Sequence, residues 1–109
     1  MSREEGNKEH ITDRISRSLG TLIWRRHARE EAESDEVSES ELEDAIRRSF
    51  TLVEHYPEDP YGESALILTF VGDKPVHVVI SPREDFCYLV TVYVPDPAKW
   101  DETFIRRKR

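Results

Sequence analysis

The sequence has few of the residues that build cross-links, metal sites and phosphate-binding loops. Cys87 is the only cysteine, so no disulfide can form within the chain, which fits a reducing compartment. There are only four glycines and no glycine-rich phosphate loop, and neither a cysteine pair nor a His-Glu-x-x-His motif is present to bind zinc. A nucleophile elbow is missing as well. These absences exclude the commonest cofactor- and metal-dependent classes, and we expect no cofactor and no metal.

Long apolar runs are also missing, and the sequence therefore predicts no membrane-spanning segment. The first residues, Met1 to Glu5, lack the apolar stretch of a signal peptide, and we expect a cytoplasmic protein. A chain of 109 residues suits one domain and can bury a core without disulfides. We expect that domain over residues 10–105, between a flexible N-terminus at 1–9 and a basic tail at 106–109.

Charge is plentiful, but most of it has the wrong sign for nucleic acid. Charged residues make up 36% of the chain, and the net charge is −7. An acidic chain repels phosphate at long range, so any contact with RNA must rest on a local basic patch. The candidates for nucleic-acid binding are Arg25, Arg26, Arg29 and Arg83. The alternative is that these arginines belong to ordinary solvated faces.

The first half of the chain has the periodicity of helices. Ile11, Ile15 and Leu19 share one helical face, and Thr12 or Asp13 is placed to cap that helix. The segment 27–33 is rich in good helix formers. Ser40 and Glu43 have capping-box spacing, which predicts a third helix ending near residue 49. The run 21–24 is either a short strand or the start of the next helix.

The second half has the pattern of strands. Four runs are rich in β-forming residues, at 52–56, 65–71, 76–80 and 88–94. The connections between them are short, which predicts an antiparallel meander. Asp96 followed by Pro97 predicts a short helical turn, with Trp100 docking on the body. The predicted fold class is α+β, with N-terminal helices packed on a four-stranded antiparallel meander sheet.

Alternation along these strands gathers a set of polar residues. It places His77 opposite Val76 and Val78, and it places Thr91 and Tyr93 opposite Val90, Val92 and Val94. If the valine faces meet the helices, then His77, Thr91 and Tyr93 lie on the open sheet face, with either Glu54 or His55 beside them.

Such a set has the groups needed to cleave a phosphodiester. His77 or Glu54 would act as general base on a ribose hydroxyl, with Tyr93 nearby and Arg83 steadying the developing charge. His27, beside Arg25, is a further candidate for a base or a phosphate contact. The alternative is a solvated sheet face dotted with polar residues, and a helix start in a solvated basic run.

The order and spacing of several motifs are those of a known family. The motifs are His27-Ala28 before an Arg/Glu-rich helix, Val53-Glu54-His55-Tyr56-Pro57, Pro75-Val76-His77-Val78-Val79, and Val92-Tyr93-Val94-Pro95-Asp96-Pro97 with Trp100. From about residue 10 to residue 100 the chain resembles the family catalogued as domain of unknown function 4258.

The resemblance implies an architecture similar to the small RelE-like and BrnT-like toxins, in which N-terminal helices pack on an antiparallel sheet. Many such toxins are endoribonucleases that pair with an antitoxin. This likeness points to His27, His77 and Tyr93 as the positions to watch, although it is a likeness of fold.

Two hypotheses follow for the function. The first is a toxin-like RNA-binding protein or metal-independent endoribonuclease, with RNA or an antitoxin-like protein as partner. It requires His77, Tyr93 and a basic residue to converge in one cleft. The second is a non-catalytic module that binds a protein or a small ligand, which fits the acidic charge and the missing motifs. Both leave the oligomeric state open.

Overall fold

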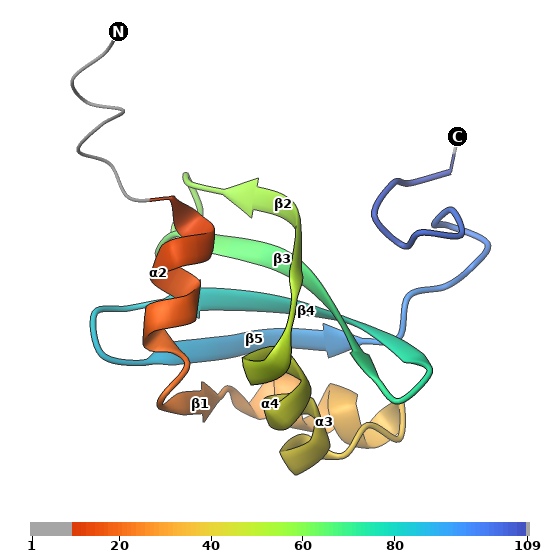
Figure 1. Cartoon of the computed structure of the whole chain (residues 1–109), viewed down its shortest axis with the longest axis horizontal. Coiled ribbons are helices and arrows are strands. Elements are labelled where there is room, and N and C mark those ends of the chain that lie inside the picture. Colours follow the sequence, from red (N-terminus) through yellow and green to blue (C-terminus); the bar gives the residue numbers. More distant parts are fainter. Residues whose placement is uncertain (1–9, 109) are drawn as a thin grey trace, which may run out of the picture.

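The computed structural model describes residues 10–108, so the N-terminal segment 1–9, for which flexibility is predicted, and Arg109 lie outside the described residues. Helices cover one face of a sheet in an α+β arrangement (Figure 1). The elements in chain order are α2 (Ile11–Ser18), β1 (Leu22–Trp24), α3 (Arg26–Ser34), α4 (Glu39–Arg48), β2 (Thr51–Tyr56), β3 (Ser64–Val71), β4 (Lys74–Pro82) and β5 (Cys87–Tyr93). None of the described helices is long and apolar enough to cross a bilayer.

The sheet has five strands in the order β1-β5-β4-β3-β2. Strands β2 to β5 form the predicted antiparallel meander, but β1 adds a fifth strand that runs parallel to β5. The prediction of a four-stranded, purely antiparallel sheet is therefore wrong. The prediction rested on the rule that short connections join antiparallel strands. β1 is separated from β5 by two helices and three strands, and that rule does not apply to such a long connection.

The core lies between the helices and the sheet face that β3, β4 and β5 present to them. Ile67, Val78 and Val92 are paired across these strands, and all three are fully buried. From the helices, the buried Ile15 of α2 and Ile46 of α4 join the same cluster. The prediction that the apolar strand faces meet the helices is confirmed for these positions.

A β-bulge breaks the alternation in β5. Val79 pairs with Thr91 while its neighbour Ile80 pairs with Leu89, so β5 has one extra residue at this point. As a result Leu89 and Val92 both lie in the core, and Val90 does not. The prediction that Val90 shares a face with Val92 is wrong because strict alternation does not survive a bulge.

Two helix starts also differ from those predicted. α4 is capped by Ser38, whose hydroxyl accepts a hydrogen bond from the amide of Glu41, two residues before the predicted capping box. α2 begins at Ile11, directly after His10, rather than behind a cap at residue 12 or 13. Each shift lengthens the helix at its N-terminus and leaves its buried face as predicted.

Helix α3 protects the edge of β5 that β1 is too short to cover. β1 ends at Trp24, and the carboxylates of Glu31 and Asp35 then accept hydrogen bonds from the amides of Val92 and Val94, at 2.9 and 2.8 Å. An open strand edge would leave these amides without partners, so α3 completes the hydrogen bonding of the strand.

After β5 the chain folds back across the sheet face that α2 and α4 leave uncovered. We call residues 95–108 the C-terminal strap (Figure 1, dark blue). The predicted helical turn is a single turn, in which the amides of Lys99 and Trp100 both donate to the carbonyl of Asp96. Trp100 is only 4% exposed, so the predicted docking of this ring is confirmed. Residue 107, expected in the basic tail, forms an antiparallel bridge with Trp100.

Candidate functional site

Polar and aromatic side chains gather in two places on the uncovered sheet face. We call Glu54, Tyr56, His77 and Tyr93 the His77 cluster, and it lies beneath the C-terminal strap. We call the cavity lined by Arg25, Tyr61, Arg83 and Tyr88 the arginine pocket. Ser81 of β4 also lines that pocket, four residues beyond His77 on the same strand, which corresponds to roughly 13 Å.

The strand register builds the centre of the His77 cluster. His77 of β4 is paired with Tyr93 of β5, and the two rings meet edge to face with centroids 5.2 Å apart. The Nδ1 atom of His77 is 3.1 Å from the hydroxyl oxygen of Tyr93. The structure thus brings together two of the residues for which the sequence predicts a shared face.

Glu54 of β2 brings a negative charge to the same cluster. Its carboxylate accepts hydrogen bonds from the hydroxyl of Tyr56 and from Nε and Nη2 of Arg107, the latter two at 3.2 and 3.1 Å. The hydrogen bonds from Arg107 and then from Tyr56 hold the pKa of Glu54 below its ordinary value. Burial, followed by the contact with Glu54, raises the pKa of Tyr56. The cation beside the cluster is therefore Arg107, and the expected Arg83 lies elsewhere.

The strap covers His77 completely, whereas the other members of the cluster are partly exposed. His77 is 0% exposed, and its Nε2 atom is 2.7 Å from the carbonyl oxygen of Phe104. The rings of Trp100 and His77 meet edge to face, with their centroids 4.5 Å apart. The guanidinium of Arg107 lies over the Trp100 ring, 4.6 Å from its centroid. Burial lowers the pKa of His77. In this closed arrangement both imidazole nitrogens have protein partners, so no substrate can reach them.

His27 does not join this cluster. It lies on α3, with its side chain 69% exposed, and its Nε2 atom is 2.9 Å from a carboxylate oxygen of Glu31. The other oxygen of Glu31 accepts the hydrogen bond from the amide of Val92. The structure therefore places His27 beside the carboxylate that protects the edge of β5.

The arginine pocket is built around the ring of Tyr88. The guanidinium carbon of Arg25 lies 4.3 Å from the ring centroid, and that of Arg83 lies 5.3 Å from it. The cavity they line has a volume of about 330 Å³. Tyr61, from the loop between β2 and β3, also lines it and is 86% exposed. The pocket thus combines two cations with an open aromatic ring.

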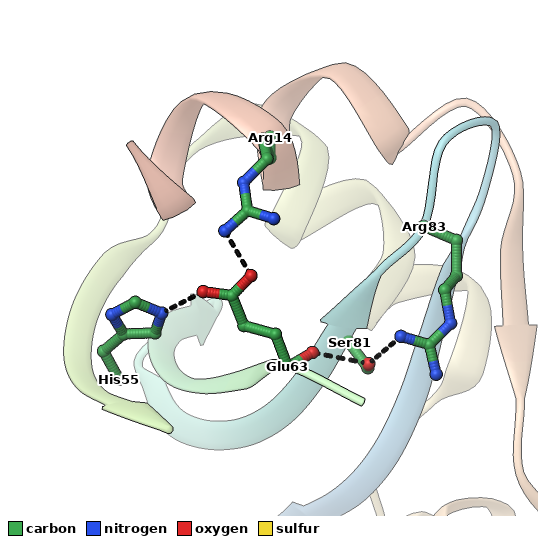
Figure 2. Close-up of polar contacts among 5 residues, drawn as sticks. All are labelled: Arg14, His55, Glu63, Ser81 and Arg83. Atoms are coloured by element: carbon green, nitrogen blue, oxygen red, sulfur yellow. Dashed lines mark hydrogen bonds and ion pairs between the residues drawn. The ribbon is translucent and has the colours of Figure 1, made fainter. Parts of the chain in front are cut away.

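Arg83 is held in place by a chain of hydrogen bonds (Figure 2). Its Nη1 donates to the hydroxyl of Ser81 at 3.0 Å, and that hydroxyl donates to the backbone carbonyl of Glu63 at 2.7 Å. The side chain of Glu63 is fixed in turn by Arg14 of α2 and His55 of β2 (Figure 2). Although burial raises it, the pKa of Glu63 is held below its ordinary value by these two partners. The base of the pocket is therefore tied to three separate elements.

The two guanidiniums of the pocket keep their charge available. Across residues 10–108, neither Arg25 nor Arg83 forms an ion pair with a carboxylate. Asp59 also lines the pocket, and its carboxylate accepts hydrogen bonds from the amide of Tyr61 and the hydroxyl of Ser64. These hydrogen bonds, with a smaller contribution from the charge of Arg83, hold the pKa of Asp59 below its ordinary value. Local positive charge in an acidic protein is what an anionic ligand requires.

The other two arginines predicted to bind nucleic acid do not line the pocket. Arg29 pairs with Glu39 at 2.8 Å and lies over the ring of Trp24. Arg26 is exposed on α3. The structure therefore brings together Arg25 and Arg83, one from each of the two sequence regions that the prediction named.

Sequence reasoning missed five residues of these sites: Tyr56 in the His77 cluster, Tyr61 and Tyr88 in the arginine pocket, and Phe104 and Arg107 in the strap. Counting back from Val92 by strict alternation places Tyr88 in the core, and only the bulge turns it outward. Tyr61 stands in a loop of turn formers, where an exposed aromatic ring is itself a signal. Nothing in the sequence pairs Phe104 or Arg107 with β2 or β4.

No set of potential metal ligands accompanies these sites in the described part of the chain. Across residues 10–108, no three histidine, cysteine, aspartate or glutamate side chains are grouped so that they would hold an ion. Cys87 is fully buried, and burial raises the pKa of its thiol to about 11. Any chemistry on this face therefore depends on the imidazole, phenol, carboxylate and guanidinium groups described above.

Fold and site together define a small α+β domain with a basic aromatic pocket and a covered histidine cluster on one sheet face. The model of the family described as domain of unknown function (DUF4258) matches residues 24–94, which is more than half of the chain, and the protein belongs to this family. Neither a curated protein nor a solved structure matches the chain. The matched segment contains Arg25, His77, Arg83 and Tyr93, and it ends before the C-terminal strap.

Proposed function

We propose that this protein binds single-stranded RNA through the arginine pocket. The observation that carries the proposal is the pairing of Arg25 and Arg83 around Tyr88, at a cavity of about 330 Å³, with neither cation in a close ion pair with a carboxylate among residues 10–108. Guanidinium groups bind phosphate oxygens through paired, charge-assisted hydrogen bonds. Both cations therefore suit the backbone of a nucleic acid.

The aromatic residues of the pocket favour a single strand over a duplex. Tyr61 is 86% exposed at the pocket rim, and an exposed ring of this kind stacks on an unpaired base. Tyr88 keeps Arg25 close to the cavity wall, where a planar guanidinium also stacks on bases. Bases inside a duplex are already stacked on one another, so they have no free face on which such rings could stack.

The net charge of −7 sets a limit on how this binding works. The protein as a whole repels RNA, so the contacts must be local and few. Two phosphate contacts on a single strand predict a slope of about −1.4 when the logarithm of the binding constant is plotted against that of the salt concentration. A much steeper slope would indicate a broad basic surface, which this chain does not have.

The test is fluorescence anisotropy with a labelled single-stranded RNA of ten nucleotides and mixed sequence. The variant R25A/R83A is expected to lose about 100-fold in affinity, because each of the two charge-assisted contacts is worth at least about 1.4 kcal/mol. The control R48A/R106A removes the same charge from two other exposed positions and is expected to bind within twofold of the wild type.

Equal losses in the two double variants would contradict a specific pocket, and so would a wild-type protein that does not bind. Competition with a free mononucleotide separates an RNA site from a small-ligand site. If the mononucleotide displaces the oligonucleotide at equal concentration, the protein is a nucleotide-binding module, which is the non-catalytic alternative.

A second candidate function, metal-independent RNA cleavage, is favoured by the convergence of His77, Tyr93 and Glu54 beside Arg107. In an open form His77 or Glu54 would remove the proton from a ribose hydroxyl, and a guanidinium would steady the phosphorane. Incubation with total RNA tests it: H77A/Y93F should abolish any cleavage that the wild type shows.

A further inference from the structure

The C-terminal strap is folded on itself more than on the sheet. Among the described residues, its backbone hydrogen bonds join strap residues to one another: Asp101 to Arg106, Phe104 to Asp101, and Lys108 to Lys99. No residue of the strap pairs with a strand of the sheet in the ladder register. The strap therefore has its own hydrogen-bonded turns, and its attachment to the body rests on side-chain contacts and on the buried Trp100.

The hydrogen bonds and the ring contact between the strap and the sheet face all lead to the His77 cluster. They are the carbonyl of Phe104 on His77, the ring of Trp100 on the same imidazole, and the guanidinium of Arg107 on Glu54. The Arg107–Glu54 ion pair is partly open to water, with side chains 61% and 32% exposed, so water can replace it. Removal of the strap would therefore uncover a base and a carboxylate together.

One residue of the strap is in a conformation that the closed state must maintain. Phe104 has φ of 62°, in the left-handed region that residues other than glycine avoid. The strained residue is the one whose carbonyl reaches His77. The hydrogen bonds from Phe104 to Asp101 and from Asp101 to Arg106 hold this turn within the strap, and the turn presents the carbonyl of Phe104 to His77.

The covered cluster and the arginine pocket lie on the same face of β4, roughly 13 Å apart. A strand of RNA held at the pocket and running along this face meets the strap. The segment matched by the family model ends at residue 94, so both sites belong to the matched unit and the strap does not.

We infer that the C-terminal strap is a displaceable cover over the His77 cluster, and that single-stranded RNA anchored in the arginine pocket displaces it. This inference deepens the proposed function and rests on it for the identity of the ligand. The strap occupies the path of the strand in the free protein, and RNA long enough to reach His77 opens it.

The first experiment measures the cover without any RNA. Diethyl pyrocarbonate modifies accessible neutral imidazoles, and mass spectrometry reports its reaction at His77, with the exposed His27 as internal reference. In the wild type, His77 should react far more slowly than His27. R107E should raise the rate at His77 at least about tenfold, and R106E, which makes the same charge change one residue away on the exposed side, should leave it unchanged.

Circular dichroism shows whether R107E keeps its fold, and R107Q offers a milder change with the same expected direction. The double variant E54R/R107E restores an ion pair and should restore protection of His77. If His77 stays unreactive in folded R107E and R107Q, or reacts as fast as His27 in the wild type, the cover does not exist.

The second experiment measures displacement by RNA through the emission of Trp100, with W100F supplying the constant background of Trp24. A ten-nucleotide RNA should shift the emission of Trp100 to the red, and a dinucleotide that fills only the pocket should not. R25A/R83A should abolish the shift.

The two experiments separate the two ideas. If RNA binds to the pocket by anisotropy but leaves the Trp100 emission unchanged, displacement is refuted while the proposed function stands. If no RNA binds at all, the proposed function fails and the identity of the ligand fails with it, although the reactivity of His77 in R107E still decides whether the strap is a cover.

Discussion

The carbonyl oxygen of Phe104 lies 2.7 Å from Nε2 of His77, a residue that precedes it by 27 positions in the chain. A carbonyl can only accept a hydrogen bond, so Nε2 must carry the proton. The Nδ1 atom of the neutral ring is then an acceptor, and the hydroxyl of Tyr93 donates to it. This single contact fixes the tautomer of the imidazole and ties the C-terminal strap to the centre of the sheet.

Truncation of this pair should cost stability. H77A leaves the inward-facing carbonyl of Phe104 and the hydroxyl of Tyr93 without their partner and opens a cavity, so we expect a loss of about 2 to 4 kcal/mol in the free energy of unfolding. Y93F removes only one hydrogen bond and should cost about 1 kcal/mol. Urea denaturation followed by circular dichroism measures both. A smaller loss for H77A than for Y93F would contradict the described network.

Stability should fall on mild acidification because of His77. Its pKa is lowered from 6.5 in the folded state, chiefly by burial, with Arg107 acting in the same direction and Phe104 and Glu54 opposing it. The unfolded chain therefore binds a proton at a higher pH than the folded one. The contribution of the neutral ring is fully present above about pH 6.5 and is lost as the pH falls through the folded pKa.

Urea midpoints between pH 5 and pH 8 test this dependence, with H77Q as the matched variant. The other three histidines remain in both proteins and supply a common background. The decline of the midpoint below pH 6.5 should be shallower in H77Q. Equal slopes in the two proteins would show that His77 does not titrate differently on folding.

Gly62 should be intolerant of a side chain. Its φ is 116°, and a Cβ atom would stand 2.5 Å from Nη1 of Arg83. G62A should therefore weaken RNA binding by displacing Arg83, and it should destabilise the fold by at least about 2 kcal/mol. Gly72 is the matched control, because its φ of 62° is also left-handed but nothing lies within 4 Å of its Cβ position. G72A should cost about 1 to 2 kcal/mol and leave RNA affinity unchanged.

The carboxylates of α3 should control exchange at the edge of β5. Glu31 and Asp35 accept the amide hydrogen bonds of Val92 and Val94. E31A and D35A should each cost about 1.5 to 3 kcal/mol and speed hydrogen exchange at the corresponding amide. E33A changes an exposed glutamate of the same helix and should alter neither quantity. Nuclear magnetic resonance resolves the two amides individually.

Cys87 should be chemically silent in the folded protein. Its side chain is fully buried, and burial raises the pKa of the thiol to about 11. At pH 8 the thiolate fraction is then more than about 100-fold smaller than in an unfolded chain, so a disulfide reagent should react at least that much more slowly. Reaction in urea provides the comparison. Rapid reaction of the native protein would show that the thiol is accessible.

The sequence predicts most of what repeats regularly and little of what depends on distant contacts. Ile11, Ile15 and Leu19 are correctly placed on a buried face because helical periodicity is a local property. β1 remained undecided because three residues have no period of their own, and its partner β5 lies far along the chain. The cap of α4 is Ser38 and not the predicted Ser40. The sequence could not distinguish them, because each serine precedes a glutamate by three residues and has the same capping-box spacing.

The candidate site shows the same division. Alternation places His77 and Tyr93 on one face, whereas their direct pairing across β4 and β5 is set by the register of the two strands. Strict alternation fails at Val90 and Tyr88, where the extra residue of the bulge reverses the faces. The arginine pocket therefore could not be predicted from alternation. The cover over His77 was not predicted either, since the sequence shows that Trp100 docks and does not show on what.

The parallel pairing of β1 with β5 has a consequence for synthesis on the ribosome. β1 is the first strand in the chain and its partner β5 is the last, so β1 emerges early and waits for β5. Until then Trp24 and the apolar face of α2 have no complete surface to pack on. The sheet can therefore be completed only late, and the interval before β5 emerges is when the nascent chain is most exposed to aggregation and to chaperones.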